Sequence, residues 1–164
     1  MNSESMSECA VLLKKLAEHD SDTVLCEGLG REQSELFQRS LSKPLAKFYL
    51  DFLAFSNGAQ IGPYRLFSVG DSPKMIEIVQ RNQDMAAYVP ELKNGEVYGF
   101  GNDWGGSMLC FDLRDTKAAG DWPILIWNHE YSEEPEDAPN LWSKMAANFS
   151  EFLMTLVKDA LEDS

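Results

Sequence analysis

Residues 96–113, EVYGFGNDWGGSMLCFDL, decide the fold of this 164-residue chain. Two short runs rich in apolar and aromatic residues, 96–101 and 107–113, flank the turn residues 102–106. A connection this short joins antiparallel neighbours, so the stretch predicts a β-hairpin. A third run of the same kind, residues 122–128, follows after a short connection and extends the hairpin into a meander.

Amphipathic helices are predicted before this meander. The first spans residues 5–19, where Ser5 and the glutamate three residues later have capping-box spacing. The clearest helix has Ser42 as its cap and Pro44 in its first turn, and it ends at the Asn-Gly pair 57–58. Its buried face, with i, i+3, i+4, i+7 spacing, consists of Leu45, Phe48, Tyr49, Phe52, Leu53 and Ser56.

Further elements fill the interval between the aromatic helix and the hairpin. Residues 64–68 predict a strand, and the Ser-Pro pair 72–73 begins a helix. This helix ends before Pro90, because a residue that precedes proline avoids helical geometry. Residues 23–30 allow a short extended piece, and residues 32–38 fit a helical turn. The inner side of the helix before Pro90 is expected to carry Met75, Ile78, Val79 and Asn82.

The C-terminal part contains an acidic loop, residues 130–140, and a last helix. Asn148 and Glu151 have cap spacing for that helix. Whether residues 141–147 join it is left open. Helices on both sides of an antiparallel meander predict one α+β domain over residues 1–164. The inward face of the last helix is expected to consist of Phe149, Phe152, Leu153, Leu156 and Val157.

The charge balance of the chain is strongly acidic. It has 27 aspartates and glutamates against 14 lysines and arginines, which gives a net charge of −13. Such a charge repels phosphate backbones, so no nucleic-acid partner is expected. It attracts basic proteins and raises their association rates. Solubility alone is the alternative explanation of this composition.

The cysteines and the N-terminus predict a cytoplasmic protein. Cys9, Cys26 and Cys110 are an odd number without a Cys-x-x-Cys pair, which favours reduced thiols over disulfides or zinc. Residues 1–8 are acidic where a signal peptide would be basic. No apolar run approaches the roughly 18 residues that cross a membrane, so no membrane association is expected.

No group of residues has catalytic spacing. The two histidines, His19 and His129, form no His-x-x-x-His pair of the kind that binds zinc. Residues 105–107, Gly-Gly-Ser, lack the Gly-x-Ser-x-Gly pattern of a nucleophile turn and fit hairpin geometry instead. We expect no catalytic residue, no cofactor and no metal. The aspartates available for a calcium or magnesium site lie on different turns and strands: Asp103, Asp112, Asp115 and Asp121.

Aromatic side chains beside carboxylates indicate a contact surface for a basic protein. Trp104 lies in the hairpin turn and Tyr131 in the acidic loop, and such anchors are typical of protein interfaces. The alternative for Trp104 is that it folds back over the sheet. Trp122 and Trp127 alternate with core positions and are expected to be structural. The predicted partner-binding residues are Asp103, Trp104, Glu130, Tyr131, Glu133, Glu134, Glu136 and Asp137.

The order of four segments resembles the SUKH superfamily, which includes fungal cell-wall-synthesis regulators. Residues 43–53 (KPLAKFYLDFL) are similar to its opening helix, and residues 100–113 (FGNDWGGSMLCFDL) to its central hairpin. Residues 123–130 (PILIWNHE) resemble the strand that follows, and residues 148–153 (NFSEFL) the closing helix. The resemblance covers about residues 30–160. The chain departs from the usual pattern in the Lys-Pro that opens the helix and in Ser107, where an acidic residue is common.

The resemblance implies a non-catalytic binding domain, because no catalytic residues come with this family. Its bacterial members are typically immunity proteins, which bind and neutralise secreted toxins, many of them nucleases. We therefore expect an immunity protein whose partner is a basic toxin domain, with its oligomeric state open. A regulatory scaffold is the second hypothesis. A small hydrolase that uses Asp112, His129 and Glu130 is the third.

Overall fold

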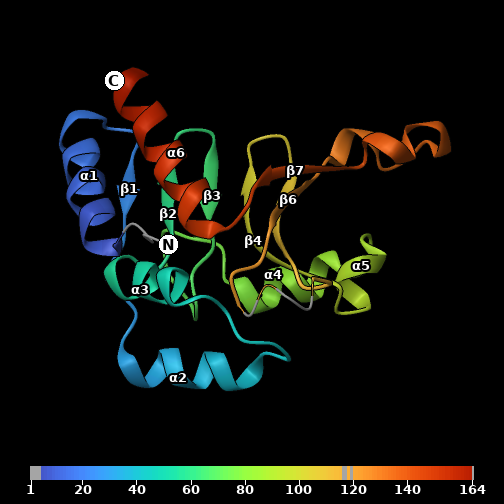
Figure 1. Cartoon of the computed structure of the whole chain (residues 1–164), viewed down its shortest axis with the longest axis horizontal. Coiled ribbons are helices and arrows are strands. Elements are labelled where there is room, and N and C mark those ends of the chain that lie inside the picture. Colours follow the sequence, from blue (N-terminus) through green and yellow to red (C-terminus); the bar gives the residue numbers. More distant parts are fainter. Residues whose placement is uncertain (1–4, 116–117, 119, 164) are drawn as a thin grey trace.

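The sheet of this computed structural model is an antiparallel meander (Figure 1). The structure describes residues 5–115, 118 and 120–163, apart from the side chains of Pro135 and Asp137. Within these ranges seven strands lie side by side in chain order, each antiparallel to the next. They are β1 (Val24–Leu25), β2 (Ala59–Ile61), β3 (Tyr64–Leu66), β4 (Val97–Asp103), β5 (Met108–Asp112), β6 (Ile124–Trp127) and β7 (Trp142–Ala146). The predicted meander is confirmed.

Helices from both ends of the chain pack together on this sheet. Figure 1 shows α1, α3 and α6 beside strands β1 to β3, with α4 and α5 near β4. In the described ranges no helix is long and apolar enough to cross a membrane. The predicted α+β class is confirmed. The helices are α1 (Met6–His19), α2 (Arg31–Ser40), α3 (Lys47–Phe55), α4 (Ile78–Met85), α5 (Pro90–Lys93) and α6 (Phe149–Asp163), and two 3₁₀ helices, η1 (His129–Tyr131) and η2 (Pro135–Asn140), join β6 to β7.

Phe149, the first residue of α6, lies at the centre of an aromatic cluster. Its ring centroid is 4.9 Å from that of Tyr49 in α3 and 5.5 Å from that of Phe100 in β4. Phe111 in β5 lies 5.0 Å from Tyr49 and 4.5 Å from Phe100. All four side chains are buried. Edge-to-face contacts add to the stability that burial of the rings provides. The aromatic face predicted for residues 45–56 is therefore the centre of the core.

The cap predicted for the last helix is present. The Oδ1 atom of Asn148 accepts a hydrogen bond of 2.9 Å from the backbone N–H of Glu151. The Glu151 carboxylate accepts one of 2.9 Å from the N–H of Ala147. Two backbone donors at the start of α6 are thus satisfied by side chains. The apolar face predicted for this helix is buried throughout.

The starts of α3 and α1 differ from the prediction. α3 begins at Lys47, after Pro44 and the predicted cap Ser42. The indole N–H of Trp122 donates to the Pro44 carbonyl at 2.7 Å, and this tertiary bond holds the preceding residues in an extended path. At α1, the hydroxyl of Ser5 bonds to a neighbouring serine and makes no cap hydrogen bond, so the predicted capping box is not formed.

The helix predicted from residues 72–73 also begins later, at Ile78. The N–H of Ser68 donates to the Ile76 carbonyl at 2.9 Å, and the N–H of Ile78 donates to the Ser68 carbonyl at 2.7 Å. This short parallel bridge fixes the residues before α4 in an extended conformation. Val79, expected on the inner side of the helix, is exposed, whereas Ile78 is buried and Asn82 bonds to β4, as expected for that side.

β7 (Trp142–Ala146) lies within residues 141–147, which the sequence left unassigned. Ala146 is its only buried residue, so the strand lacks the apolar alternation that would have revealed it. Its place is fixed by pairing with β6, which aligns Trp142 with Trp127.

Asn82 of α4 completes the edge of β4 where β3 ends. Its amide Nδ2 donates to the Gly99 carbonyl at 2.8 Å, and its Oδ1 accepts from the Gly99 N–H at 2.8 Å. The side-chain amide therefore takes the place of a strand residue. A side chain at Gly99 would collide with the Met108 sulfur, since a Cβ there would lie 2.5 Å from it.

The buried hydroxyl of Tyr49 gives a stability prediction. It has no hydrogen-bond partner among the described residues, and burial raises its pKa, so it remains neutral. A buried unsatisfied polar group costs about 1–3 kcal/mol. We expect Tyr49→Phe to raise the free energy of unfolding by about 1 kcal/mol in urea titrations. Tyr88→Phe, the same change at an exposed side chain, should leave stability unchanged. Destabilisation by Tyr49→Phe would contradict the account of this core.

Candidate protein-binding surface

The β4–β5 turn, residues 103–107, is held by the carboxylate of Asp103. Its Oδ1 atom accepts hydrogen bonds of 2.9 Å from the backbone N–H groups of Gly105 and Ser107. Gly106 has a φ of 92°, a conformation that favours glycine. Aspartate at the start of a turn commonly bonds to the backbone two residues on. Asp103, predicted to bind a partner, thus has a structural task in shaping the turn.

Trp104, at the tip of this turn, is exposed. The residue is 70% exposed, so the alternative in which it folds back over the sheet is wrong. The guanidinium carbon of Arg65 lies 5.1 Å from the centre of the indole ring and covers one side of it. By contrast, Trp122 and Trp127 are buried, as expected.

The acidic segment, residues 130–137, forms η1 and the first part of η2 between β6 and β7. Figure 1 shows η1 and η2 beyond the ends of β6 and β7, on the side of the molecule away from α1. Tyr131 is half-buried, and Asp137 lies in η2 with its side chain outside the described part. The remaining predicted residues are exposed and form no ion pair with another described side chain: Glu130, Glu133, Glu134 and Glu136.

Hydrogen bonds at its base fix where the acidic segment leaves the sheet. The side-chain amide of Asn128 donates to the Asn140 carbonyl at 2.8 Å and to the Ser143 hydroxyl at 3.2 Å. The N–H of Asn128 donates to the Leu141 carbonyl at 2.7 Å. The two ends of the segment are thereby tied together at the ends of β6 and β7.

The Trp104 turn and the start of the acidic segment are adjacent. The backbone N–H of His129 donates to the Ser107 hydroxyl at 3.1 Å. A Cβ built on Gly106 would lie 3.7 Å from the His129 ring. The structure therefore joins the start of the acidic segment to the Trp104 turn, some 25 residues away in the sequence.

Two cationic residues near Trp104 were not predicted from the sequence. Arg65 of β3 and Arg81 of α4 line one hollow with Trp104 and Asp103. The pairing of β3 with β4 places Arg65 opposite Asn102 and Tyr64 opposite Asp103. Burial raises the pKa of Tyr64, and the Asp103 carboxylate raises it further. The position of Arg65 depends on strand register and that of Arg81 on the packing of α4 beside β4, so no local motif could have revealed the arginines.

Of the three residues in the hydrolase hypothesis, Asp112 lies far from His129 and Glu130. His129 follows β6 beside the start of β5, because Met108 pairs with Trp127. Asp112 is the last residue of β5, about 13 Å along the strand from Met108 at roughly 3.3 Å per residue. Its Oδ1 accepts a bond of 2.8 Å from Arg114. In the described part of the chain no three histidine, cysteine, aspartate or glutamate side chains gather as metal ligands.

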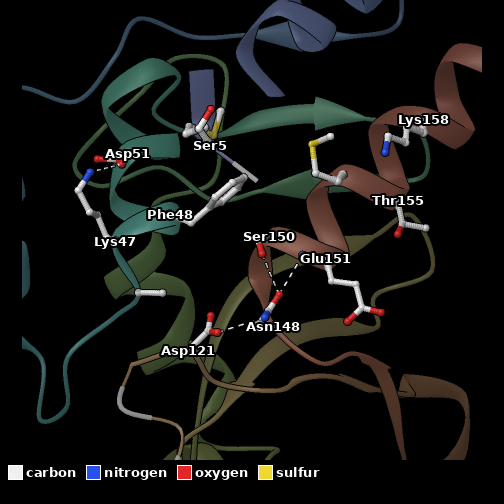
Figure 2. A pocket seen from close by; sticks show the side chains of 13 residues that line it. Ser5, Lys47, Phe48, Asp51, Asp121, Asn148, Ser150, Glu151, Thr155 and Lys158 are labelled. Atoms are coloured by element: carbon white, nitrogen blue, oxygen red, sulfur yellow. Dashed lines mark hydrogen bonds and ion pairs between the residues drawn. The ribbon is translucent and has the colours of Figure 1, made fainter. Parts of the chain in front are cut away.

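A separate hollow of about 730 Å³ lies between α1, α3 and α6 (Figure 2). Its polar side chains are largely engaged with one another. Asn148 donates to Asp121 at 3.1 Å and accepts from Ser150 at 2.9 Å, while Lys47 pairs with Asp51. None of the predicted partner-binding residues lines it. These hydrogen bonds and this ion pair stabilise α3 and the start of α6.

The sequence shows the family to which the chain belongs. Residues 29–155 match the model of the SMI1/KNR4 family (SUKH-1). The chain belongs to this family, and the match runs from the loop before α2 into α6. The predicted resemblance is confirmed. A comparison with curated proteins gives no match.

Mutation can separate the hydrogen bonds that Asp103 accepts in the turn from its negative charge. Asp103→Ala removes the acceptor of two backbone hydrogen bonds, so we expect a loss of about 1–2 kcal/mol in thermal unfolding. Asp103→Asn keeps Oδ1 and should retain most of that stability, although it removes the charge. Glu133→Ala, at an exposed side chain, should have no effect. If Asp103→Ala is as stable as the unaltered protein, the carboxylate does not hold the turn.

Proposed function

We propose that this protein is a non-catalytic immunity protein, which neutralises a secreted toxin by binding it one to one. The observation that carries the proposal is the acidic segment, whose exposed carboxylates follow His129, a residue hydrogen-bonded to the turn that carries the exposed Trp104. Membership of the SMI1/KNR4 family (SUKH-1) supports it, since immunity proteins occur in this superfamily.

The charge of the acidic segment supports a basic partner. Five carboxylates lie within eight residues of the connection between β6 and β7. The protein has a net charge of −13, and these carboxylates make the electrostatic potential around the segment more negative still. Complementary charge raises association rates by about 10–10³ at low salt and selects against acidic partners.

Binding without chemistry is sufficient for neutralisation. A standard interface buries about 1,600 Å² in total, an area large enough to cover a toxin's active site or substrate groove. If the toxin is a nuclease, its substrate surface is basic, and the acidic segment presents a competing array of carboxylates. Trp104 supplies the aromatic anchor on which such interfaces depend.

Genetic context tests the immunity role. We expect a gene adjacent to this one to encode a protein that arrests growth when expressed alone. Co-expression with the present protein should restore growth, because the complex is inactive. If no neighbouring gene is toxic and the purified protein instead binds several regulatory proteins of its own cell, a regulatory scaffold replaces the proposal.

The acidic segment is tested by neutralising its charge. Converting the five carboxylates to their amides should slow association with the toxin by about tenfold or more at low salt and flatten its salt dependence. Stopped-flow kinetics measure both. The control converts five exposed carboxylates elsewhere, Glu18, Glu27, Glu32, Asp159 and Asp163, and so changes net charge equally. Equal slowing in both variants would mean that net charge, and not the acidic segment, steers the partner.

A further inference from the structure

Positive charge gathers around Trp104, in contrast to the rest of this acidic chain. Arg65 and Arg81 line a hollow of about 210 Å³ on one side of the indole. Arg65 and Lys74 line a second hollow, of about 400 Å³, that Trp104 also borders. The Arg65–Trp104 pair therefore forms a ridge shared by two hollows. Three of the 14 lysines and arginines of the chain lie at this ridge.

The arginines at the ridge are half-buried. Neither Arg65 nor Arg81 forms an ion pair with another side chain of the described part of the chain. Asp103 is the acidic residue of the smaller hollow, and its Oδ1 is bonded to the backbone of the turn. Half-buried guanidinium groups of this kind gain most from a carboxylate that a ligand supplies.

The indole ring orients Arg65. The guanidinium carbon lies over the ring, 5.1 Å from its centre, and this contact holds the side chain beside the indole. Fewer rotamers remain open to the side chain, so less entropy is lost when a carboxylate binds. Pro63 and Ile76 give the same hollow an apolar wall, which suits a ligand with a hydrocarbon part.

We propose that the Arg65–Trp104 ridge binds an aspartate or glutamate side chain of a protein partner, with an apolar residue beside it. The smaller hollow has two arginines and one aspartate, a balance that suits one carboxylate and not a polyanion. The net charge of −13 disfavours nucleic acid. This site is opposite in chemistry to the acidic segment and does not depend on the proposed immunity role.

The test uses the indole N–H signals of the full-length protein in ¹H–¹⁵N NMR spectra. The probe is the capped peptide Gly-Ser-Leu-Glu-Phe-Gly, and its counterpart with glutamine in place of glutamate is the control. We expect the Trp104 signal, assigned through Trp104→Phe, to shift with the glutamate peptide and not with the glutamine peptide. The signals of Trp122 and Trp127 should stay in place, because both side chains are buried.

Arg65→Gln and Arg81→Gln should each weaken the binding of the glutamate peptide at least fivefold. Lys15→Gln, which removes an exposed charge on α1, should bind it normally. Unchanged Trp122 and Trp127 signals in each variant show that the fold is intact. An unmoved Trp104 signal, an equal response to both peptides, or normal binding by both arginine variants would overturn the proposal. A larger shift with a short thymidine oligonucleotide would overturn it in favour of nucleic acid.

Discussion

The packing of the Phe149 ring against α3 and the central hairpin is the contact on which the rest of the structure depends. Phe149 begins α6, and its ring contacts Tyr49, Phe100 and Phe111, which come from three other elements. Burial of these rings supplies the main driving force that joins the N-terminal helices, the meander and the last helix. Since this core lies over the middle of the sheet, the connections at the strand ends are left exposed. Trp104 and the acidic segment belong to those connections.

Charge is distributed unevenly over this exposed end. The acidic segment leaves the sheet between β6 and β7, while Arg65 and Arg81 border the turn between β4 and β5. His129 and Ser107, joined by a hydrogen bond, mark where the two regions meet. A partner with a basic surface and one well-placed carboxylate would complement both regions. Paired opposite charges also favour specificity, because a partner that matches only one region leaves the other desolvated without compensation.

Residue periodicity predicted the parts of the fold that are fixed by apolar burial. The aromatic face of α3, the hairpin of β4 and β5, and the cap of α6 at Asn148 follow from local patterns. The start of α3 does not, because Pro44 is bonded to Trp122, a residue far along the chain. β7 has one buried residue and so no pattern to detect. At the candidate site, the exposed carboxylates were predictable from composition, whereas the approach of Arg65 to Trp104 depends on strand register.

In the proposed function, the protein acts by forming a complex and not by turnover. Titration of the purified toxin with increasing amounts of this protein, with residual toxin activity as the measured quantity, tests it most directly. The account predicts a linear fall that ends at one equivalent, with activity recovered when the complex is separated in denaturant and the toxin is refolded. Complete inactivation by a small fraction of an equivalent, with a covalently altered toxin, would show catalysis and contradict the account.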